Sequence, residues 1–338
     1  SKVESVCPMP PITRSARARV SFIDELTDEL LITILANVRF ISHGTLRAIC
    51  HRLKALVKSP AMGAERLLSG RAEYGQLMAG GAYFNETITP HCWLLADGGC
   101  RKVANMSTPR CNTTSAIVEE EVWVIGGIAS YAGGLASLPL RSVDIFNPLT
   151  ETWRRGPDMN ESRMAPLCGV VGGTLIVVGG FDGAPLTSAE AYTPATGWYN
   201  LPHLPFESFN GAACVINGHL YVAGGGHKEL QCWDGSGVWT LKACLPLARM
   251  ASMAYCHNSK MVLSGGIVRH EDGREERSGS YMYDPDKDQW ETSDLPPGKL
   301  RLLGPRERRT CELNGVAVGM TAGSIHIASV EFAPVFLG

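Results

Sequence analysis

A diglycine that ends an apolar run recurs five times in this chain and limits the folds open to it. The copies are Gly80-Gly81, Gly126-Gly127, Gly179-Gly180, Gly224-Gly225 and Gly265-Gly266. A sixth, degenerate copy reads Val316-Ala317-Val318-Gly319-Met320. Successive copies lie 41 to 54 residues apart. A repeat of this length predicts an array of similar units that bury their apolar surfaces against one another.

Each copy contains four short segments of strand character. In the second copy, 115–118 and 122–125 are apolar runs, 142–146 alternates, and Trp153 opens a fourth segment after a turn at Asn147-Pro148. The next three copies repeat this order and end near Trp198, Trp239 and Trp290. The pattern predicts a mainly β fold, a six-bladed β-propeller. The glycines permit close backbone approach, and the tryptophans pack between neighbouring blades.

These units resemble kelch repeats, in which an apolar strand ends in Gly-Gly and a spaced Trp follows. A Met-x-x-x-Arg segment often joins one kelch unit to the next. Met106-Ser-Thr-Pro-Arg110 and Met159-Asn-Glu-Ser-Arg163 match that segment, and Leu247-Ala-Arg249 matches it loosely. The resemblance covers residues 72–338. Cys100 stands where a Trp is expected, and Met320 replaces the second glycine of the last copy. The sequence therefore does not identify the strand that closes the ring.

The first seventy residues have a helical period instead. Leu26, Leu30, Leu31, Ile34 and Leu35 form one apolar stripe, with Thr27 or Asp28 as the expected N-cap. A second amphipathic helix is predicted over 44–57, ended by Ser59-Pro60, and a third over 61–68. We therefore expect a flexible segment over 1–19, a helical domain over 20–70 and the repeat domain over 71–338.

The helical segment resembles an F-box. Leu26-Thr-Asp-Glu-Leu-Leu-Ile-Thr-Ile-Leu35 is similar to the opening of that motif, and the run from Leu46 to Val57 is similar to its second half. Thr27 replaces the usual proline and Leu53 the usual tryptophan. F-box followed by kelch is a recurring domain pair, and its members are substrate-recognition subunits of Skp–cullin–F-box (SCF) ubiquitin ligases. The resemblance therefore implies a non-catalytic receptor with a Skp-family adaptor, a cullin–RING ligase and an unknown protein substrate as partners.

The same resemblance implies two sets of contact residues. The adaptor-facing or core stripe of the F-box comprises Leu26, Leu30, Leu31, Ile34, Leu46, Ile49 and Leu53, and the sequence does not separate those two roles. The residues expected to line a substrate pocket are Arg110, Arg163, Arg249 and Arg309, with Asn210 in the equivalent place of the fourth copy. Such a ring suits an acidic peptide. The alternative is that these arginines form hydrogen bonds only between blades.

Composition narrows the remaining classes of function. The net charge of −2 argues against nucleic-acid binding, and we expect no membrane segment. Eleven cysteines without a CxxC pair indicate reduced thiols, so we expect a cytoplasmic or nuclear protein. The sequence contains no GxGxxG, P-loop or HExxH motif, so we expect no metal and no cofactor. Two alternatives stay open: a kelch scaffold that recruits no ligase, and a propeller enzyme with titratable side chains converging in a polar pocket.

Overall fold

The computed structural model of the chain describes most of the repeat region and parts of the helical region. The described residues are 26–36, 51–57, 75–81, 88–96, 99–119, 121–132, 135–136, 138–148, 150–270, 274–277 and 279–294. Contacts divide the chain into two units, Ser1–Glu73 with Phe336–Gly338, and Tyr74–Val335. The predicted helix over 61–68, the sixth diglycine copy, Leu46, Ile49 and Arg309 lie outside the described residues.

The first unit contains the helices α2 (Asp28–Ala36) and α4 (His51–Val57). Thr27 is the N-cap of α2, because its Oγ1 accepts a hydrogen bond from the backbone N of Leu30 at 3.3 Å. Asp28 and Glu29 in the first turn favour the positive end of the helix dipole. The core between the two helices consists of Leu31, Leu35, Leu53 and Leu56.

Arg52 of α4 ties the two helices together. Its guanidinium donates to Asp28 Oδ1 at 3.0 and 2.7 Å and to the backbone carbonyl of Leu26 at 2.5 Å. Both the carboxylate and the carbonyl lie at the start of α2, so one side chain fixes where that helix begins against α4.

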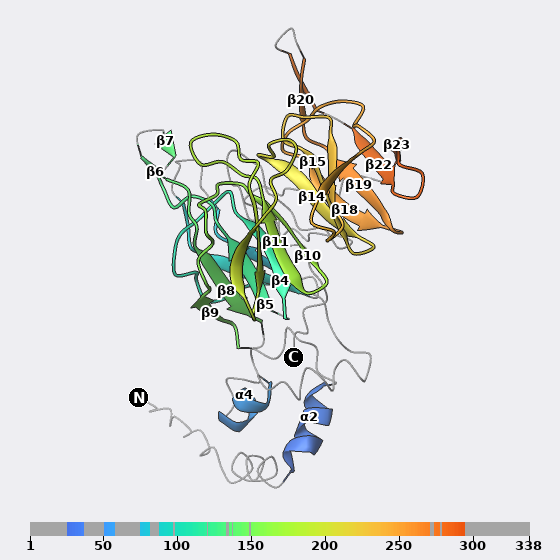
Figure 1. Cartoon of the computed structure of the whole chain (residues 1–338). Coiled ribbons are helices and arrows are strands. Elements are labelled where there is room, and N and C mark those ends of the chain that lie inside the picture. Colours follow the sequence, from blue (N-terminus) through green and yellow to red (C-terminus); the bar gives the residue numbers. More distant parts are fainter. Residues whose placement is uncertain are drawn as a thin grey trace, which may run out of the picture. The chain divides into compact units, whose positions relative to one another are not determined.

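The second unit consists of consecutive antiparallel sheets (Figure 1). Sheet 1 has three described strands, β1 (Gly75–Ala79), β2 (Cys92–Ala96) and β3 (Gly99–Lys102). Sheet 2 has β4 (Thr114–Val118), β5 (Glu121–Ile125), β8 (Val143–Asn147) and β9 (Thr152–Arg155). Sheet 3 has β10 (Leu167–Val171), β11 (Thr174–Val178), β12 (Ala189–Thr193) and β13 (Gly197–Leu201). Sheet 4 has β14 (Gly211–Ile216), β15 (His219–Gly224), β16 (Leu230–Trp233) and β17 (Trp239–Lys242). Sheet 5 has β18 (Met253–His257), β19 (Lys260–Ser264), β22 (Ser280–Asp284) and β23 (Gln289–Ser293).

The sheets follow one another in chain order, with their first strands adjacent. β4 contacts β10, β10 contacts β14, and β14 contacts β18, although each belongs to a different sheet. The clusters of buried apolar residues run between neighbouring sheets; one joins Ile145 of sheet 2 to Val177 of sheet 3. The described part of this unit is therefore a propeller-like series of four-stranded sheets.

Each fourth strand carries a tryptophan that bonds to the preceding sheet. Nε1 of Trp153 donates to the carbonyl of Ala104 at 2.8 Å, just beyond β3. Trp198, Trp239 and Trp290 repeat the contact with the carbonyls of Pro157, Pro202 and Ala243, at 3.0, 3.0 and 2.8 Å. The prediction that these tryptophans pack between neighbouring units is confirmed. In sheet 1, Cys100 pairs with Leu95 at the register position of the tryptophan.

The diglycines lie where two sheets approach most closely. Gly126 has a φ of +67°, and a Cβ added to it would lie 2.5 Å from the carbonyl oxygen of Arg163. Gly179 has a φ of +61°, and its Cβ would lie 2.1 Å from the carbonyl oxygen of Ser208. Only glycine fits both the backbone conformation and the available space.

Candidate functional site

All long connections of the four-stranded sheets leave at the same end, which we call the long-loop face. In sheet 2 the connection from β5 to β8 covers 126–142 and the one from β9 to β10 covers 156–166. The turns at the opposite end, 119–120 and 148–151, are short. Two ribbons extend from the long-loop face, β6 (Tyr131–Ala132) with β7 (Leu135–Ala136), and β20 (Ile267–Arg269) with β21 (Glu275–Arg277) (Figure 1). Long loops on a rigid scaffold are the usual place for binding residues.

Arg110, one of the predicted pocket residues, is fully buried behind this face. Its Nη1 donates to the carbonyls of Gly126 and Ser142 at 3.1 and 2.9 Å. Its Nη2 donates to Ser142 Oγ at 3.1 Å and to Asp144 Oδ2 at 3.0 Å. Burial lowers the pKa of Arg110, and the negative charge of Asp144 opposes that shift. The Arg110 carbonyl accepts from the backbone N of Gly81 at 2.9 Å, so the residue connects sheets 1 and 2.

Arg163 makes the equivalent contacts one sheet later. Its Nη1 donates to the carbonyls of Gly179 and Ser188 at 2.7 and 3.1 Å. Its Nε donates to Glu190 Oε1 at 3.0 Å, and its Nη2 donates to Glu161 Oε2 at 2.8 Å. Glu190 is as deeply buried as the arginine. The third strands of sheets 2 and 3 thus each supply a buried carboxylate to the arginine that precedes the sheet.

The fourth copy differs from the prediction made for it. Each bonded arginine precedes the first glycine of its diglycine by 16 residues, and the residue 16 before Gly224 is Ser208. The Ser208 carbonyl accepts from the backbone N of Gly180 at 2.7 Å, as the arginine carbonyls do elsewhere. Placing Asn210 in the arginine position was therefore wrong, because the register of sheet 4 is the same as in the other sheets and gives that position to Ser208, three residues before Gly211 opposite Gly224. Gln231 takes the carboxylate position, and its Nε2 donates to Ser208 Oγ at 3.1 Å.

Asn210 instead lies in the next segment of the connection. It is exposed, has a φ of +56°, and its carbonyl accepts from the backbone N of Ala251 at 2.7 Å. Asn112 holds the same place before sheet 2, with its carbonyl accepting from Ala165 at 2.7 Å. That Asn210 contacts a substrate stays a prediction.

Arg249 is the third described arginine of the series. Its Nη1 donates to the carbonyls of Gly265 and Gly279 at 3.1 and 3.0 Å. Its guanidinium carbon lies 4.7 Å from the centre of the Tyr281 ring. Tyr281 pairs with Leu263, which is the register position held by Asp144 and Glu190 in their sheets. Burial lowers the pKa of Arg249.

The three arginines thus hold each diglycine to the third strand of its own sheet. Their guanidinium groups form hydrogen bonds to other residues of the repeat domain. Such bonds agree with the alternative interpretation, in which the arginines connect blades. That they also contact a substrate stays a prediction. The sequence held a signal for the carboxylates, because Ser142-Val-Asp144 and Ser188-Ala-Glu190 repeat a Ser-x-acid pattern at the start of the third strand.

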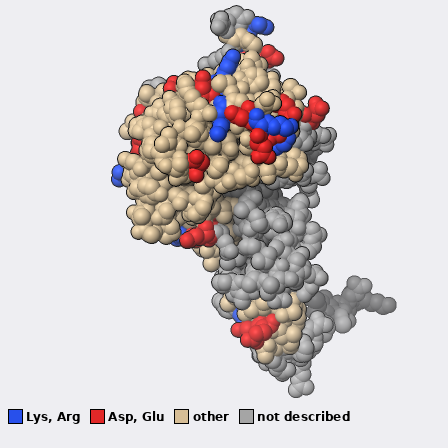
Figure 2. Space-filling view, turned by 45° about the vertical axis from the view of Figure 1, so that its right-hand side comes forward, with Lys and Arg blue, Asp and Glu red and all other residues tan. Residues whose placement is uncertain are grey.

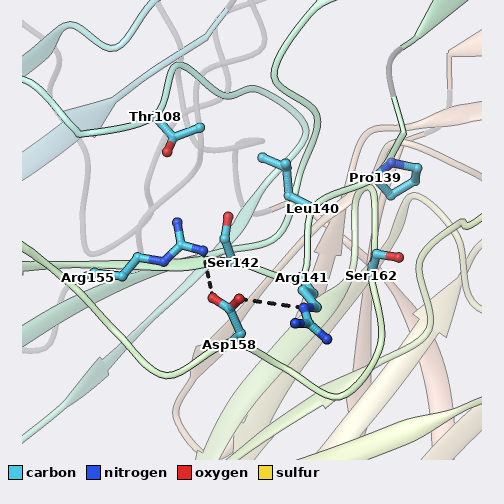
Figure 3. A pocket seen from close by; sticks show the side chains of 8 residues that line it. All are labelled: Thr108, Pro139, Leu140, Arg141, Ser142, Arg155, Asp158 and Ser162. Carbon is cyan, nitrogen blue, oxygen red and sulfur yellow. Dashed lines mark hydrogen bonds and ion pairs between the residues drawn. The ribbon is translucent and has the colours of Figure 1, made fainter.

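A cavity of about 350 Å³ opens on the long-loop face of sheet 2 (Figure 3). Its lining residues are Thr108, Pro139, Leu140, Arg141, Ser142, Arg155, Asp158 and Ser162. The Asp158 carboxylate lies between two guanidinium groups, 2.6 Å from Arg155 Nη2 and 3.5 Å from Arg141 Nε. The cavity therefore contains one more basic than acidic side chain.

Two hydroxyl groups of this cavity form hydrogen bonds within the domain. Ser142 Oγ accepts from Arg110, and Ser162 Oγ donates to Asp182 Oδ2 at 2.7 Å. The two arginines and the hydroxyl groups of the lining suit a polar or anionic group.

The visible side of the molecule in Figure 2 is mostly uncharged. Some of its acidic and basic side chains form a mixed cluster and others lie singly, without a large area of one sign (Figure 2). Among the residues that the structure describes, no group of His, Cys, Asp and Glu has the arrangement of a metal site. No helix in the described ranges is long and apolar enough to cross a membrane.

The described part of the F-box stripe divides into core and surface residues. Leu31 and Leu53 are each 3% exposed and belong to the core between α2 and α4, while Leu26 is partly buried against it. Leu30 and Ile34, one helical turn apart, are 48% and 47% exposed. The surface of α2 therefore presents two neighbouring apolar side chains.

Comparison with known proteins supports the assignment of both the helical region and the repeat region. The F-box domain model matches residues 23–63, and the Kelch motif model matches residues 109–160 and 162–204. A putative F-box/kelch-repeat protein of Arabidopsis thaliana is 29% identical over 142 residues. That match covers 42% of this chain, and the chain spans 41% of the relative's length.

A likeness to a solved structure concerns the fold alone. The structure of YjhT aligns with 75% of this chain and 93% of its own length, with a TM-score of 0.57 and 16% identity. Together with the four-stranded sheets, these matches give the domain composition of the chain. It is an F-box over residues 23–63 followed by kelch motifs, the arrangement that its sequence predicts.

Proposed function

We propose that this chain is the substrate-recognition subunit of an SCF-type ubiquitin ligase. The observation that carries the proposal is the F-box match at 23–63, which precedes kelch motifs in the same chain. The F-box unit binds a Skp-family adaptor, which connects it to the cullin–RING part of the ligase, and the kelch domain binds a protein substrate. No covalent chemistry takes place on this chain. It acts by raising the effective concentration of the substrate near the ubiquitin-charged enzyme.

The adaptor-binding surface in this proposal centres on Leu30 and Ile34. Both side chains are half-exposed on α2, whereas Leu31 and Leu35 on the same helix are buried in the core of the unit. An apolar pair on one face of an amphipathic helix is suited to docking against an apolar groove of a partner.

The substrate-binding surface in this proposal is the long-loop face of the kelch domain. We infer that the domain is a closed ring of six blades, in which sheets 1 to 5 are followed by a sixth built around the degenerate copy at 316–320. The regular succession of described sheets supports this inference. We place the action of the protein in the cytoplasm or nucleus, because eleven cysteines without a CxxC pair suit a reducing compartment.

The adaptor contact can be tested with a double substitution, Leu30→Asp with Ile34→Asp. Two carboxylates on the exposed face of α2 should reduce capture of a purified Skp-family adaptor by at least tenfold in a pull-down. The core of the unit should stay intact because neither side chain belongs to it. Leu241→Asp, which places one carboxylate at an exposed leucine of β17, is the control and should leave capture unchanged.

Unchanged capture by the double variant would reject the adaptor surface. If the unmodified chain itself captures no adaptor, the ligase function is wrong and a kelch scaffold without a ligase becomes the better description. Substrates can be identified by affinity purification under proteasome inhibition, comparing the unmodified chain with the double variant.

A further inference from the structure

Thr108 lines the cavity on the long-loop face and is followed directly by a proline. The dipeptide Thr108-Pro109 lies in the connection from β3 to β4. The side chain of Thr108 is half-exposed, and its hydroxyl forms no hydrogen bond with another residue that the structure describes. Protein kinases of the proline-directed class phosphorylate a serine or threonine that precedes a proline. The position of Thr108 therefore combines a kinase substrate sequence with an unbonded hydroxyl.

The other two Thr-Pro pairs of the chain lack this combination. Thr89 is only 6% exposed, and its Oγ1 accepts a hydrogen bond from the backbone N of His91 at 3.1 Å. Thr193 lies in the short turn between β12 and β13, and its hydroxyl bonds to the hydroxyl of Thr196 at 2.7 Å. Both hydroxyl groups are thus already used within the domain, and that of Thr108 is not.

Two guanidinium groups of the same cavity have donors that the described part of the chain leaves unused. Arg155 bonds to Asp158 through Nη2 at 2.6 Å, and Arg141 Nε lies 3.5 Å from the same carboxylate. Nη1 of Arg155 and the terminal nitrogens of Arg141 meet no acceptor among the described residues. Figure 3 shows Nη1 of Arg155 on the side of Thr108, whose hydroxyl points into the same space. The volume of about 350 Å³ leaves room there for a phosphate group.

The chain on both sides of Thr108 is fixed to the domain. Met106 is 4% exposed and Arg110 is fully buried, so the residues two before and two after Thr108 are anchored. Ser107 Oγ donates to Asp144 Oδ1 at 2.9 Å. A group attached to the Thr108 hydroxyl is therefore held at the cavity, while the side chain itself stays accessible.

We propose that Thr108 is a phosphorylation site and that Arg155 and Arg141 bind its phosphate. In the modification, Thr108 Oγ1 attacks the γ-phosphorus of ATP on a proline-directed kinase. The new O–P bond forms as the bond from that phosphorus to the bridging oxygen of ADP breaks, and the hydroxyl proton passes to a base of the kinase.

The charge of the cavity suits this modification. Phosphothreonine carries about −1.5 to −2 charges at neutral pH, which exceeds the one excess positive charge of the cavity. Its oxygens accept charge-assisted hydrogen bonds from the unused guanidinium nitrogens. Phosphorylation thus adds contacts between the β3–β4 connection and Arg155 at the end of β9, and it changes the sign of the charge on this part of the long-loop face. The proposal does not depend on adaptor binding.

The binding of the phosphate is tested on the full chain with phosphothreonine incorporated at position 108 during expression. All seven tryptophans lie within Tyr74–Val335, so tryptophan fluorescence follows thermal unfolding of that unit. The phosphate should raise the Tm by about 2–4 °C, because it adds charge-assisted hydrogen bonds within the domain. Phosphothreonine at position 193, where the hydroxyl is bonded to Thr196, is the control and should not raise the Tm.

The part played by the guanidinium groups is tested by substitution in the phosphorylated chain. Arg155→Gln should remove at least half of the gain in Tm, and adding Arg141→Gln should abolish it. Arg154→Gln is the matched control, because Arg154 is the neighbour of Arg155 in β9 and bonds to Glu121 instead of lining the cavity. The two side chains are similarly exposed, 55% for Arg154 and 48% for Arg155. Arg154→Gln should therefore keep the full gain.

The modification itself is measured by mass spectrometry after the folded chain is incubated with ATP and a purified proline-directed kinase. The kinase is one that phosphorylates synthetic peptides of all three Thr-Pro sequences at similar rates, so that differences on the folded chain come from its structure. Thr108 should be phosphorylated at least tenfold faster than Thr89 and Thr193, whose hydroxyls are bonded within the domain. Thr108→Val should remove that signal.

The proposal is overturned if phosphate at position 108 leaves the Tm unchanged or lowers it, or if the variant lacking both arginines keeps the full gain. It is also overturned if the kinase modifies the Thr108 peptide but not Thr108 of the folded chain. None of these outcomes bears on capture of the Skp-family adaptor, so this proposal and the ligase function fail separately.

Discussion

At the scale of single residues, charge and counter-charge are kept or lost together in three of the four described sites of this kind, with Arg249 as the exception. Arg110 with Asp144 and Arg163 with Glu190 are buried ion pairs, while Ser208 with Gln231 is the neutral version of the same contact. Removing one partner of a buried ion pair leaves an uncompensated charge, whereas replacing both partners is often tolerated. The chain itself therefore supplies the neutral replacement for its own ion pairs.

We predict that Arg163→Ser destabilises the kelch domain by about 3–5 kcal/mol, because it leaves the Glu190 carboxylate buried and unpaired. Adding Glu190→Gln should recover a large part of that loss, since the double variant reproduces the pairing of Ser208 with Gln231. Urea unfolding followed by tryptophan fluorescence measures the free energies for a double-mutant cycle. If the losses of unfolding free energy in the two single variants add up strictly in the double variant, the two side chains do not interact.

Residue roles were predictable only in part. The apolar stripe of α2 follows from helical periodicity, but Leu30 and Leu31 are neighbours with opposite environments. Which of them faces the core depends on the position of α4, which periodicity within one helix does not encode. Likewise, Arg110 and Asp144 are 34 residues apart in sequence, and alternation along β8 did not mark Asp144 as buried.

At the scale of secondary structure elements, the diglycine has two separate requirements, a positive φ and a close backbone approach. Sheet 3 contains both kinds of glycine. Gly179 has a φ of +61° and would bring a Cβ to 2.1 Å from the Ser208 carbonyl oxygen, while Gly172 in the β10–β11 turn has a φ of +56° and open space. A comparison of the two separates conformation from packing.

We predict that Gly172→Ala destabilises the domain by about 1–2 kcal/mol, the cost of a left-handed backbone for a residue with a Cβ. Gly179→Ala should destabilise it by roughly 1–3 kcal/mol more, because overlap with a backbone oxygen adds to the same conformational cost. Denaturant titration of both variants gives the comparison. Equal losses at the two positions would mean that the neighbouring sheet yields to the added methyl group.

The strands themselves were predictable because three signals coincide in each unit. Apolar runs, turn residues and the diglycine together mark β5 and β11 with only small differences at their ends. The fourth arginine position was not predictable from residue type, because a serine, Ser208, stands there in place of an arginine. Its role follows only from the hydrogen bonds of its backbone carbonyl and its hydroxyl group.

At the scale of the whole molecule, the chain divides into two units with separate cores. The tryptophans all belong to the unit Tyr74–Val335. Unfolding of the F-box unit and of the kelch domain can therefore be followed by different signals in one sample.

We predict that Leu31→Asp, which places a carboxylate in the core between α2 and α4, abolishes adaptor capture. The same substitution should leave the tryptophan-detected Tm of the kelch domain within about 1 °C of its original value, because no part of that core belongs to the second unit. A pull-down measures the capture of the adaptor, and thermal unfolding followed by tryptophan fluorescence measures the Tm. A fall in the tryptophan-detected Tm would show that the two units stabilise each other.

The tryptophan contacts between sheets have a direction along the chain. In each of sheets 2 to 5, the indole of the later sheet donates to a carbonyl that follows the last strand of the earlier one. During synthesis on the ribosome, the acceptor always emerges before its donor. Every new sheet can thus attach to one that is already complete, so the domain can be assembled blade by blade while translation continues.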